Sequence, residues 1–197
     1  LQQRVLIIAG SGMVGTNLAD ALLRQGDNVT ILSRPGANRW RLAAFPSQLN
    51  VVEIDYLQGV GIERIVRKSR PDVIFHLASA PFNPPSITAN EHFGVNVALT
   101  AHLLDTIRET LPETRFIFAG SCAAYGEGND LQEDAFPSPK TILGAAKQSA
   151  RLLLEVYAEL YGLRTQNLCL FTPFGPWESR NRLIPHIILS ALEGRSI

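Results

Sequence analysis

Short apolar runs alternate with longer amphipathic stretches along most of this chain. The short runs are rich in β-branched residues, which is typical of strands that are buried on both faces. The longer stretches repeat their apolar residues at helical spacing. Strands are predicted at residues 5–9, 29–32, 49–54, 72–78, 115–120 and 165–170, and helices from residue 13, around 62–66, and at 90–110, 141–161 and 183–193.

The order of these elements indicates the fold class. Strands that alternate with helices predict an α/β protein whose parallel sheet is covered by helices on both faces. Right-handed crossovers then give a doubly wound, three-layer Rossmann fold with strand order 3-2-1-4-5-6. Ligands of such sheets bind beyond the carboxyl ends of the strands, so the segments that follow the strands carry the candidate site residues.

A glycine-rich turn, Gly10-Ser11-Gly12-Met13-Val14-Gly15, leaves the first strand and opens the first helix. Gly10 allows a sharp turn, Gly12 lets a pyrophosphate approach the backbone, and Gly15 lets the helix lie near the strand. The free N–H groups of the first helical turn and the helix dipole favour phosphate there. A similar turn without a ligand is the alternative, but the strand–helix–strand context favours a dinucleotide site.

The residues that end the second strand bear on which dinucleotide binds. An NAD site usually has a carboxylate there, which bonds the ribose 2′-hydroxyl. This chain instead has Ser33 and Arg34, with Arg39 and Arg41 close behind. A hydroxyl and a guanidinium would hold a 2′-phosphate that a carboxylate would repel. We therefore predict NADP, with NAD as the alternative; the competing interpretation of Arg34 is an ordinary solvated charge.

Composition narrows the class of protein. The 197 residues are 46% hydrophobic and carry a formal net charge of zero, which fits one globular domain, with at most a small second lobe. Balanced charge gives no support for binding nucleic acid or an anionic membrane surface, and no apolar run reaches the length of a membrane span. The two cysteines, Cys122 and Cys169, match no metal or disulfide spacing. We expect no metal site and a cytoplasmic protein without a signal peptide.

Further motifs follow the remaining strands. They are Asp55 after the third strand, His76-Leu77-Ala78-Ser79 at the fourth, Asn96 in the next helix, residues 118–126 at the fifth, Gly144-Ala145-Ala146-Lys147, and residues 171–176 after the sixth. Together with the glycine-rich turn, these motifs resemble the extended short-chain dehydrogenases/reductases, the NAD(P)-dependent epimerases and dehydratases that act on nucleotide sugars. The resemblance covers nearly the whole chain.

The resemblance implies a role for each matching position. Ser121 would hydrogen-bond the substrate oxygen that is oxidised or formed, and Lys147 would hold the nicotinamide ribose and lower the pKa of a neighbouring phenol. Without the resemblance these residues would be a loop hydroxyl and a surface lysine. The implied cofactor contacts are Asp55 at the adenine, Leu77, Ala78 and Ser79 under the ribose and pyrophosphate, Asn96 in the following helix, and Pro173 and Phe174 beside the nicotinamide.

The chain departs from the family pattern at the reacting centre. Cys122 and Ala123 stand where the dehydratases carry an acid–base pair, so a dehydration is poorly supported. The remaining reactions are reduction of a 4-keto nucleotide sugar, which is the leading expectation, and epimerisation. Leu143 stands where the family has a tyrosine one helical turn before its lysine. Three explanations stay open. Tyr125, Cys122 or a water carries the proton; residue 143 was substituted to trap a complex; or the protein is a sensor or scaffold that binds nucleotide without turnover.

The resemblance also implies how the chain is organised. Residues 1–172 would form the Rossmann domain, and residues 173–197 would begin a substrate-binding lobe that is incomplete in this chain. The helices at 90–110 and 141–161 would form a homodimer interface. Within the glycine-rich turn, Ala9 stands where the family usually has glycine, which puts the local backbone geometry in question.

Overall fold

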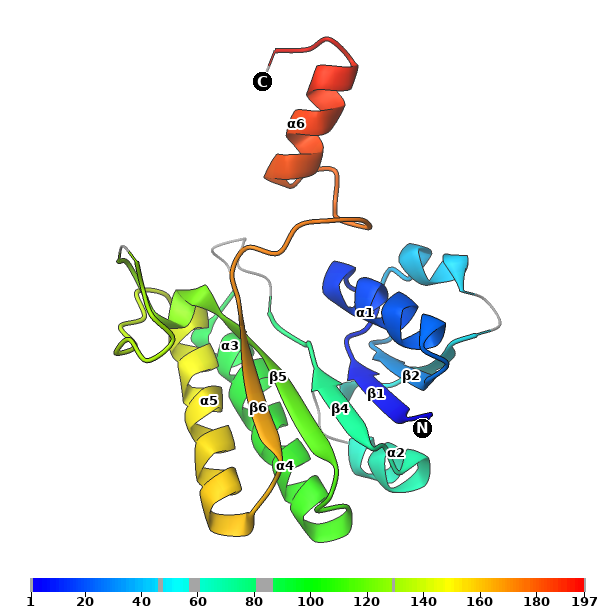
Figure 1. Cartoon of the computed structure of the whole chain (residues 1–197), viewed down its shortest axis with the longest axis vertical. Coiled ribbons are helices and arrows are strands. Elements are labelled where there is room, and N and C mark those ends of the chain that lie inside the picture. Colours follow the sequence, from blue (N-terminus) through cyan, green and yellow to red (C-terminus); the bar gives the residue numbers. More distant parts are fainter. Residues whose placement is uncertain (1, 46–47, 57–60, 81–86, 129, 197) are drawn as a thin grey trace.

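Six parallel strands form one sheet in the computed structural model, which describes residues 2–45, 48–56, 61–80, 87–128 and 130–196. Within these residues the strand order is β3-β2-β1-β4-β5-β6 (Figure 1). The doubly wound α/β fold that the alternation of elements predicted is thereby confirmed. The strands are β1 (Arg4–Ile8), β2 (Asn28–Ser33), β3 (Asn50–Glu53), β4 (Val73–His76), β5 (Arg115–Ser121) and β6 (Thr165–Leu170).

The parallel register aligns the carboxyl ends of the strands along one edge of the sheet. Ile8 at the end of β1 pairs with Leu32 of β2 on one side and with His76 of β4 on the other. His76 in turn pairs with Phe118 of β5. The glycine-rich turn and the segments that follow β2, β4 and β5 are far apart in sequence, and this register brings them to a common edge.

Helices cover the two faces of the sheet. Helices α2, α4 and α5 pack side by side on one face, over strand residues such as Leu6 and Phe116. Helix α1 and the short turn η1 lie on the other face, over Val5 and Ile31. The helices are α1 (Met13–Arg24), α2 (Ile62–Ser69), α3 (Ala89–Phe93), α4 (Leu99–Thr110), α5 (Ile142–Tyr161) and α6 (Leu183–Leu192), with the turns η1 (Trp40–Ala44), η3 (Gly94–Ala98) and η4 (Cys122–Ala124).

The helix predicted at 90–110 is present, but it is not a regular α-helix throughout. The π-helical turn η3 joins α3 to α4. The side-chain amide of Asn96 donates to the carbonyl of His92 (2.9 Å), and the hydroxyl of Thr100 donates to the carbonyl of Asn96 (2.7 Å). Such side-chain bonds compete with the backbone hydrogen bonds of a helix, so apolar periodicity alone does not reveal a π turn.

The chain after β6 crosses the carboxyl edge of the sheet toward α1 (Figure 1). The amide of Asn17 on α1 donates to the carbonyl of Pro176 (2.9 Å), and Arg41 Nε donates to the carbonyl of Trp177 (2.6 Å). Helix α6 then stands apart from the sheet and exposes apolar side chains. No helix within the described part of the chain combines the length and the apolar character that crossing a bilayer requires.

Candidate functional site

A cleft of about 510 Å³ opens at the carboxyl edge of the sheet, between the glycine-rich turn and the π-helical turn η3. It is lined by segments that are distant in sequence, because the parallel register brings the ends of β1, β2 and β4 together. The residues predicted to contact a cofactor that do line this cleft are Gly12, Arg34, Leu77, Ala78 and Ser79.

The three glycines of the turn differ in what surrounds them. A Cβ atom on Gly15 would lie 2.5 Å from the Cα of Gly10, and a Cβ atom on Gly10 would lie 2.8 Å from the side chain of Ile31. A Cβ atom on Gly12 would meet only the carbonyl oxygen of Ala9, at 3.7 Å, because this position borders the cleft. Gly10 and Gly15 thus permit close packing of helix and strand, whereas Gly12 keeps the backbone open, as an approaching pyrophosphate requires.

The amino end of α1 has no side-chain cap within the described residues. Gly12 is the N-cap residue, no described side chain accepts from the N–H groups of the first turn, and that turn contains no acidic residue. Met13 and Val14 begin the helix and are partly exposed. Their N–H groups and the helix dipole suit an anion, so this end of the cleft fits the phosphates of a dinucleotide.

Ala9 has a φ angle of +62°, in the left-handed region that residues with a Cβ atom rarely adopt. Its N–H donates to the carbonyl of Leu32 (3.0 Å), and its own carbonyl accepts from the N–H of Gly12 (3.4 Å). These bonds hold the turn in the shape that glycine favours although alanine occupies the position. Alanine at this position therefore strains the backbone locally.

Replacing Ala9 with glycine is expected to raise the free energy of unfolding by up to about 1 kcal/mol. Glycine adopts positive φ without the Cβ clash, although it loses more entropy on folding. Urea denaturation followed by circular dichroism measures the change. The matched control is Ala21→Gly, at an exposed position inside α1, which is expected to lower the free energy of unfolding by about 1 kcal/mol. A loss of stability in Ala9→Gly contradicts the strain at this residue.

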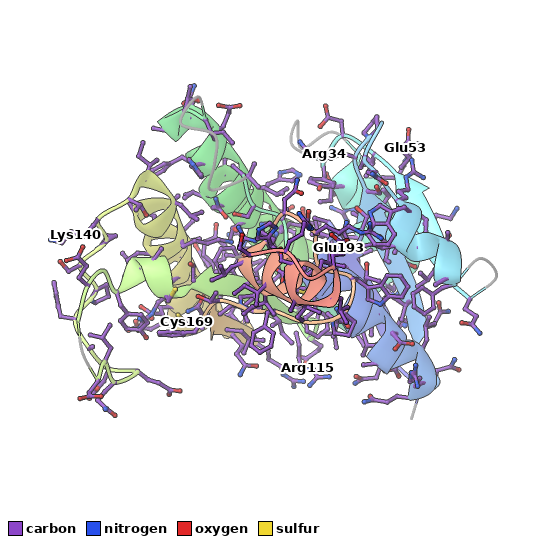
Figure 2. All side chains as sticks on the ribbon, turned by 90° about the horizontal axis from the view of Figure 1, so that it is seen from above. Arg34, Glu53, Arg115, Lys140, Cys169 and Glu193 are labelled. Atoms are coloured by element: carbon purple, nitrogen blue, oxygen red, sulfur yellow. The ribbon has the colours of Figure 1, made fainter. Side chains whose placement is uncertain are left out.

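The three arginines near the end of β2 have different environments. Arg34 lines the cleft. Arg39 forms an ion pair with Glu53, and Arg41 donates to a backbone carbonyl in the segment after β6. Figure 2 shows Arg34 and Glu53 on the same side of the molecule. Of these three arginines, Arg34 is therefore the one that lines the cleft.

Ser33 and Asp55 lie near the cleft but are not among the described residues that line it. Ser33 is only 1% exposed, and its hydroxyl lies 3.5 Å from the carbonyl of Arg34. Asp55 is exposed after β3. Tyr56, which the sequence did not single out, does line the cleft. Burial raises the pKa of the Tyr56 phenol, and the positive charge of Arg34 offsets part of this rise.

Glu91 also lines the cleft, and sequence reasoning missed it. Its N–H donates to the Thr88 hydroxyl (3.2 Å), and its carboxylate accepts from the Thr88 N–H (2.7 Å). These reciprocal bonds cap α3. The spacing Thr88-x-x-Glu91 is a known signal for the start of a helix and would have located this residue at the edge of the site.

Three further residues that were predicted to contact the cofactor, Asn96, Pro173 and Phe174, are dispersed. Asn96 is fully buried in η3, beside cleft residues Gly94 and Val95. Pro173 and Phe174 are exposed in the segment after β6, and Phe174 is 68% exposed. None of these three predicted contacts is among the described residues that line the cleft.

Lys147 is the most deeply buried charged side chain near the end of β5. Its residue is 5% exposed, its Nζ donates to the carbonyl of Ala119 (2.7 Å), and the same atom lies 4.5 Å from the ring centroid of Phe118. Burial lowers the pKa of Lys147 to about 7 from the ordinary value of 10.5. This amine therefore changes protonation state near neutral pH, unlike a surface lysine.

A second, much smaller cavity of about 10 Å³ lies at the carboxyl end of β5. All three predicted catalytic residues, Ser121, Tyr125 and Lys147, line it. The Ser121 hydroxyl accepts a hydrogen bond from the N–H of Ala123 (3.2 Å). The Tyr125 hydroxyl donates to the carbonyl of Glu133 (2.9 Å), so its proton is already engaged.

The start of α5 sets the position of Lys147 relative to Ser121. A Cβ atom on Gly144 would lie 2.1 Å from the carbonyl oxygen of Ala123, so the helix can pack this closely against η4 only with glycine there. The hydroxyl of Thr141 accepts from the N–H of Gly144 (3.0 Å) and caps the helix. Leu143 lies one turn before Lys147 and is partly exposed.

His76 is fully buried at the end of β4, with its ring edge-to-face against Phe116 and Phe118 at centroid distances of 6.1 and 5.3 Å. Neither ring nitrogen has a hydrogen-bond partner in the described part of the chain. Burial, and secondarily the charge of Lys147, lowers the pKa of His76 to about 3. The imidazole is therefore neutral at physiological pH.

Comparison with known proteins identifies a family and relatives. Residues 5–197 match the NAD dependent epimerase/dehydratase family. UDP-glucuronate 4-epimerase 3 of Arabidopsis thaliana is 26% identical to this chain over 98% of the chain and 47% of its own length. The chain thus spans about half the length of this curated relative.

Two solved structures are also similar. UDP-N-acetylglucosamine 4-epimerase from Methanobrevibacter ruminantium M1, in complex with UDP-N-acetylmuramic acid, is 27% identical with a TM-score of 0.87, over 99% of this chain and 64% of that chain. UDP-glucose 4-epimerase from Brucella ovis, in complex with NAD, is 28% identical with a TM-score of 0.75, over 85% of this chain and 51% of that chain.

Proposed function

This chain belongs to the NAD dependent epimerase/dehydratase family, and we propose that it moves a hydride between a nicotinamide dinucleotide and a sugar carbon of a nucleotide-linked sugar. The observation that carries this proposal is that Ser121 and Lys147, from different elements, line one cavity at the carboxyl edge of the sheet. The cleft with the open Gly12 backbone lies at the same edge. Substrates of this class are proposed because relatives are named as epimerases of UDP-sugars.

The proposed binding mode follows the cleft. The N–H groups of Met13 and Val14 hold the pyrophosphate, and Arg34 meets the adenosine ribose. Leu77, Ala78 and Ser79 form the floor beneath the dinucleotide. A bound nicotinamide supplies the hydride donor or acceptor, and the side chains orient the substrate against it. Ser121 then holds the reacting sugar oxygen.

The proposed reactions are reduction or epimerisation of a 4-keto nucleotide sugar. Cys122 and Ala123 offer no acid–base pair for a dehydration. The test is to supply keto sugars with reduced dinucleotide and to follow nicotinamide absorbance, with chromatography of the sugar products to detect epimers. Dinucleotide binding without conversion of any sugar contradicts the enzymatic proposal.

That last outcome would favour a second candidate function, a nucleotide-binding sensor or scaffold. The observation behind it is Leu143, an apolar side chain at the position where the resembled family has its catalytic tyrosine. A leucine neither donates nor accepts a proton. Under this alternative the chain binds dinucleotide but leaves the sugar unchanged.

We propose NADP as the preferred dinucleotide because Arg34 lines the cleft, although the Brucella ovis relative was solved with NAD. Arg34→Asp is expected to weaken NADP binding about 10- to 100-fold, since it removes a charge-assisted hydrogen bond to the 2′-phosphate. Calorimetric titration with NADP and NAD measures both affinities. Arg39→Gln, outside the cleft, is the control and should leave both unchanged. An unaltered NADP affinity in Arg34→Asp means that Arg34 does not meet the 2′-phosphate.

The division into domains and the oligomeric state are two further proposals. Residues 1–172 are proposed as the dinucleotide-binding domain and residues 173–197 as the start of a substrate-binding lobe. A homodimer through α4 and α5 is proposed because α5 exposes Leu152, Val156 and Leu160, which lie at four-residue spacing on one side of the helix. A monomeric mass in sedimentation equilibrium contradicts the dimer.

We propose a cytoplasmic location on the basis of the free cysteines Cys122 and Cys169 alone.

A further inference from the structure

The proposed hydride transfer requires a group that takes and returns the proton of the sugar hydroxyl. The cavity at the end of β5 offers four titratable side chains besides the hydroxyl of Ser121. Tyr125 already donates its proton to the carbonyl of Glu133, and Arg151 does not deprotonate in proteins. Burial raises the pKa of Cys169, so its thiol stays protonated at neutral pH. The remaining group is Lys147.

The surroundings of Lys147 suit a proton carrier better than a permanent cation. Within the described residues its Nζ has one hydrogen bond, to the carbonyl of Ala119, and it also faces the ring of Phe118. Among the residues that the structure describes, no carboxylate pairs with it. Removing an ammonium from water without a counter-charge disfavours the charged form, which is why burial lowers the pKa of Lys147 to about 7. Both protonation states are therefore populated near neutral pH.

We propose that Lys147 is itself the general base and general acid of this site, the role that a phenol has in the resembled family; this rests on the function proposed above. In the oxidative direction the neutral Nζ takes the proton of the sugar hydroxyl while the carbon loses a hydride, with its two electrons, to the bound nicotinamide. In the reductive direction the ammonium returns this proton to the carbonyl oxygen as the hydride comes back. Atoms and electrons balance in both directions.

The cavity also contains groups that stabilise the ammonium between the two steps. Gln148 Oε1 and Asn167 Oδ1 are buried, line or adjoin this cavity, and have no hydrogen-bond donor in the described part of the chain. A cavity of about 10 Å³ has room for roughly one water. The two amide oxygens can thus accept the remaining ammonium N–H groups through that water. A lysine that only held a ribose would not require acceptors on this side.

The groups that face Lys147 from its neighbours are few. They are His76 on β4, Tyr125 after β5, Arg151 on α5 and Cys169 on β6. His76 is neutral at physiological pH because burial lowers its pKa to about 3. Burial raises the pKa of the Cys169 thiol, which is therefore uncharged there, and the Arg151 guanidinium pairs with Glu155 (2.7 Å). Burial is therefore the cause that favours the neutral amine of Lys147.

The first test measures the amine directly and requires no turnover. The chain has three lysines, and Lys68 and Lys140 are both exposed, so they serve as internal references. Carbon-detected magnetic resonance of the lysine side chains, followed over pH, is expected to give Lys147 a midpoint near 7, well below the ordinary lysine value of 10.5. The free energy of unfolding should also rise as the pH increases from about 7 to 10.5. In that window the unfolded chain holds a proton that the folded chain has lost, so raising the pH disfavours unfolding.

The second test separates proton transfer from ribose binding. Lys147→Arg keeps a cation that can hold a ribose but cannot release a proton, so kcat is expected to fall about 10²- to 10⁴-fold, with the dinucleotide dissociation constant changed less than about tenfold. The wild-type rate in the oxidative direction should fall below a pH near 7, and Lys140→Arg is the matched control with unchanged kcat.

Each outcome supports or overturns the proposal. A Lys147 midpoint near 10.5, or a Lys147→Arg variant that keeps most of the wild-type kcat, overturns the role of Lys147 and leaves the proposed function standing. A wild-type protein that binds dinucleotide but converts no sugar overturns the proposed function, and the role of Lys147 with it. A midpoint near 7 together with a large loss of kcat in Lys147→Arg supports both.

Discussion

Replacing Leu143 with tyrosine is expected to raise kcat by about 100-fold. The new phenol would lie one helical turn before Lys147, so both side chains reach the same site. The nearby ammonium lowers the pKa of such a phenol by favouring the phenolate. General acid–base catalysis contributes ~10²–10⁴-fold, and the low end applies because Lys147 already supplies part of this contribution in our proposal. The measurement is steady-state turnover of the keto sugar over pH.

The matched control is Leu143→Phe, which adds the same ring without the hydroxyl. Leu143 is partly exposed, so either ring should change the free energy of unfolding by about 0.5 kcal/mol or less. If phenylalanine raises kcat as much as tyrosine does, the gain comes from packing and not from a proton. If neither variant is active although both bind dinucleotide, the site is degenerate at more positions than residue 143.

A large loss of stability is expected from Gly15→Ala. Its Cβ would lie 2.5 Å from the Cα of Gly10, and backbone on both sides leaves no flexible side chain to move away. The helix must therefore shift from the strand, which should cost about 2–4 kcal/mol in the free energy of unfolding and should abolish dinucleotide binding. Urea denaturation and calorimetric titration measure the two effects.

Gly12→Ala separates the two effects. The nearest atom to its Cβ is the Ala9 carbonyl oxygen at 3.7 Å, so the fold should lose no more than about 1 kcal/mol from the change of N-cap residue. The same Cβ would nevertheless stand where the pyrophosphate approaches, so dinucleotide affinity should fall at least about tenfold. An equal loss of stability in Gly12→Ala and Gly15→Ala would contradict this assignment. It would mean that Gly12, like Gly15, is required for the packing of the helix against the strand.

Lys147 and Leu143 can be tested together. If the amine carries the proton in the wild-type chain, Lys147→Arg should cost less in the Leu143→Tyr background, because the phenol takes over proton transfer. The two positions are one helical turn apart and therefore close enough to couple, and a smaller loss in the Leu143→Tyr background is the sign of coupling expected when they serve the same step. A loss of the same size in both backgrounds would indicate that Lys147 acts solely on the cofactor or on the fold.

The sequence by itself determined the architecture of this protein. Apolar runs and helical periodicity are local properties, and together with right-handed crossovers they predicted the six-stranded order and the edge at which ligands bind. The glycine spacing located one wall of the cleft, since a turn of this kind is defined by adjacent residues. Ser121 and Lys147 were predicted to act together from motif order, and both line one cavity.

Only the tertiary structure decided what surrounds each of these side chains. Three similar arginines follow β2, and the choice of Arg34 depended on Arg41 bonding Trp177, 136 residues away in sequence. The burial of Lys147 depended on Phe118 and the Ala119 carbonyl. Charge state and accessibility are set by desolvation and by partners from distant segments, and these are absent from any local pattern. For that reason the sequence predicted where a site is expected, whereas only the fold showed which of its side chains are buried and which are exposed.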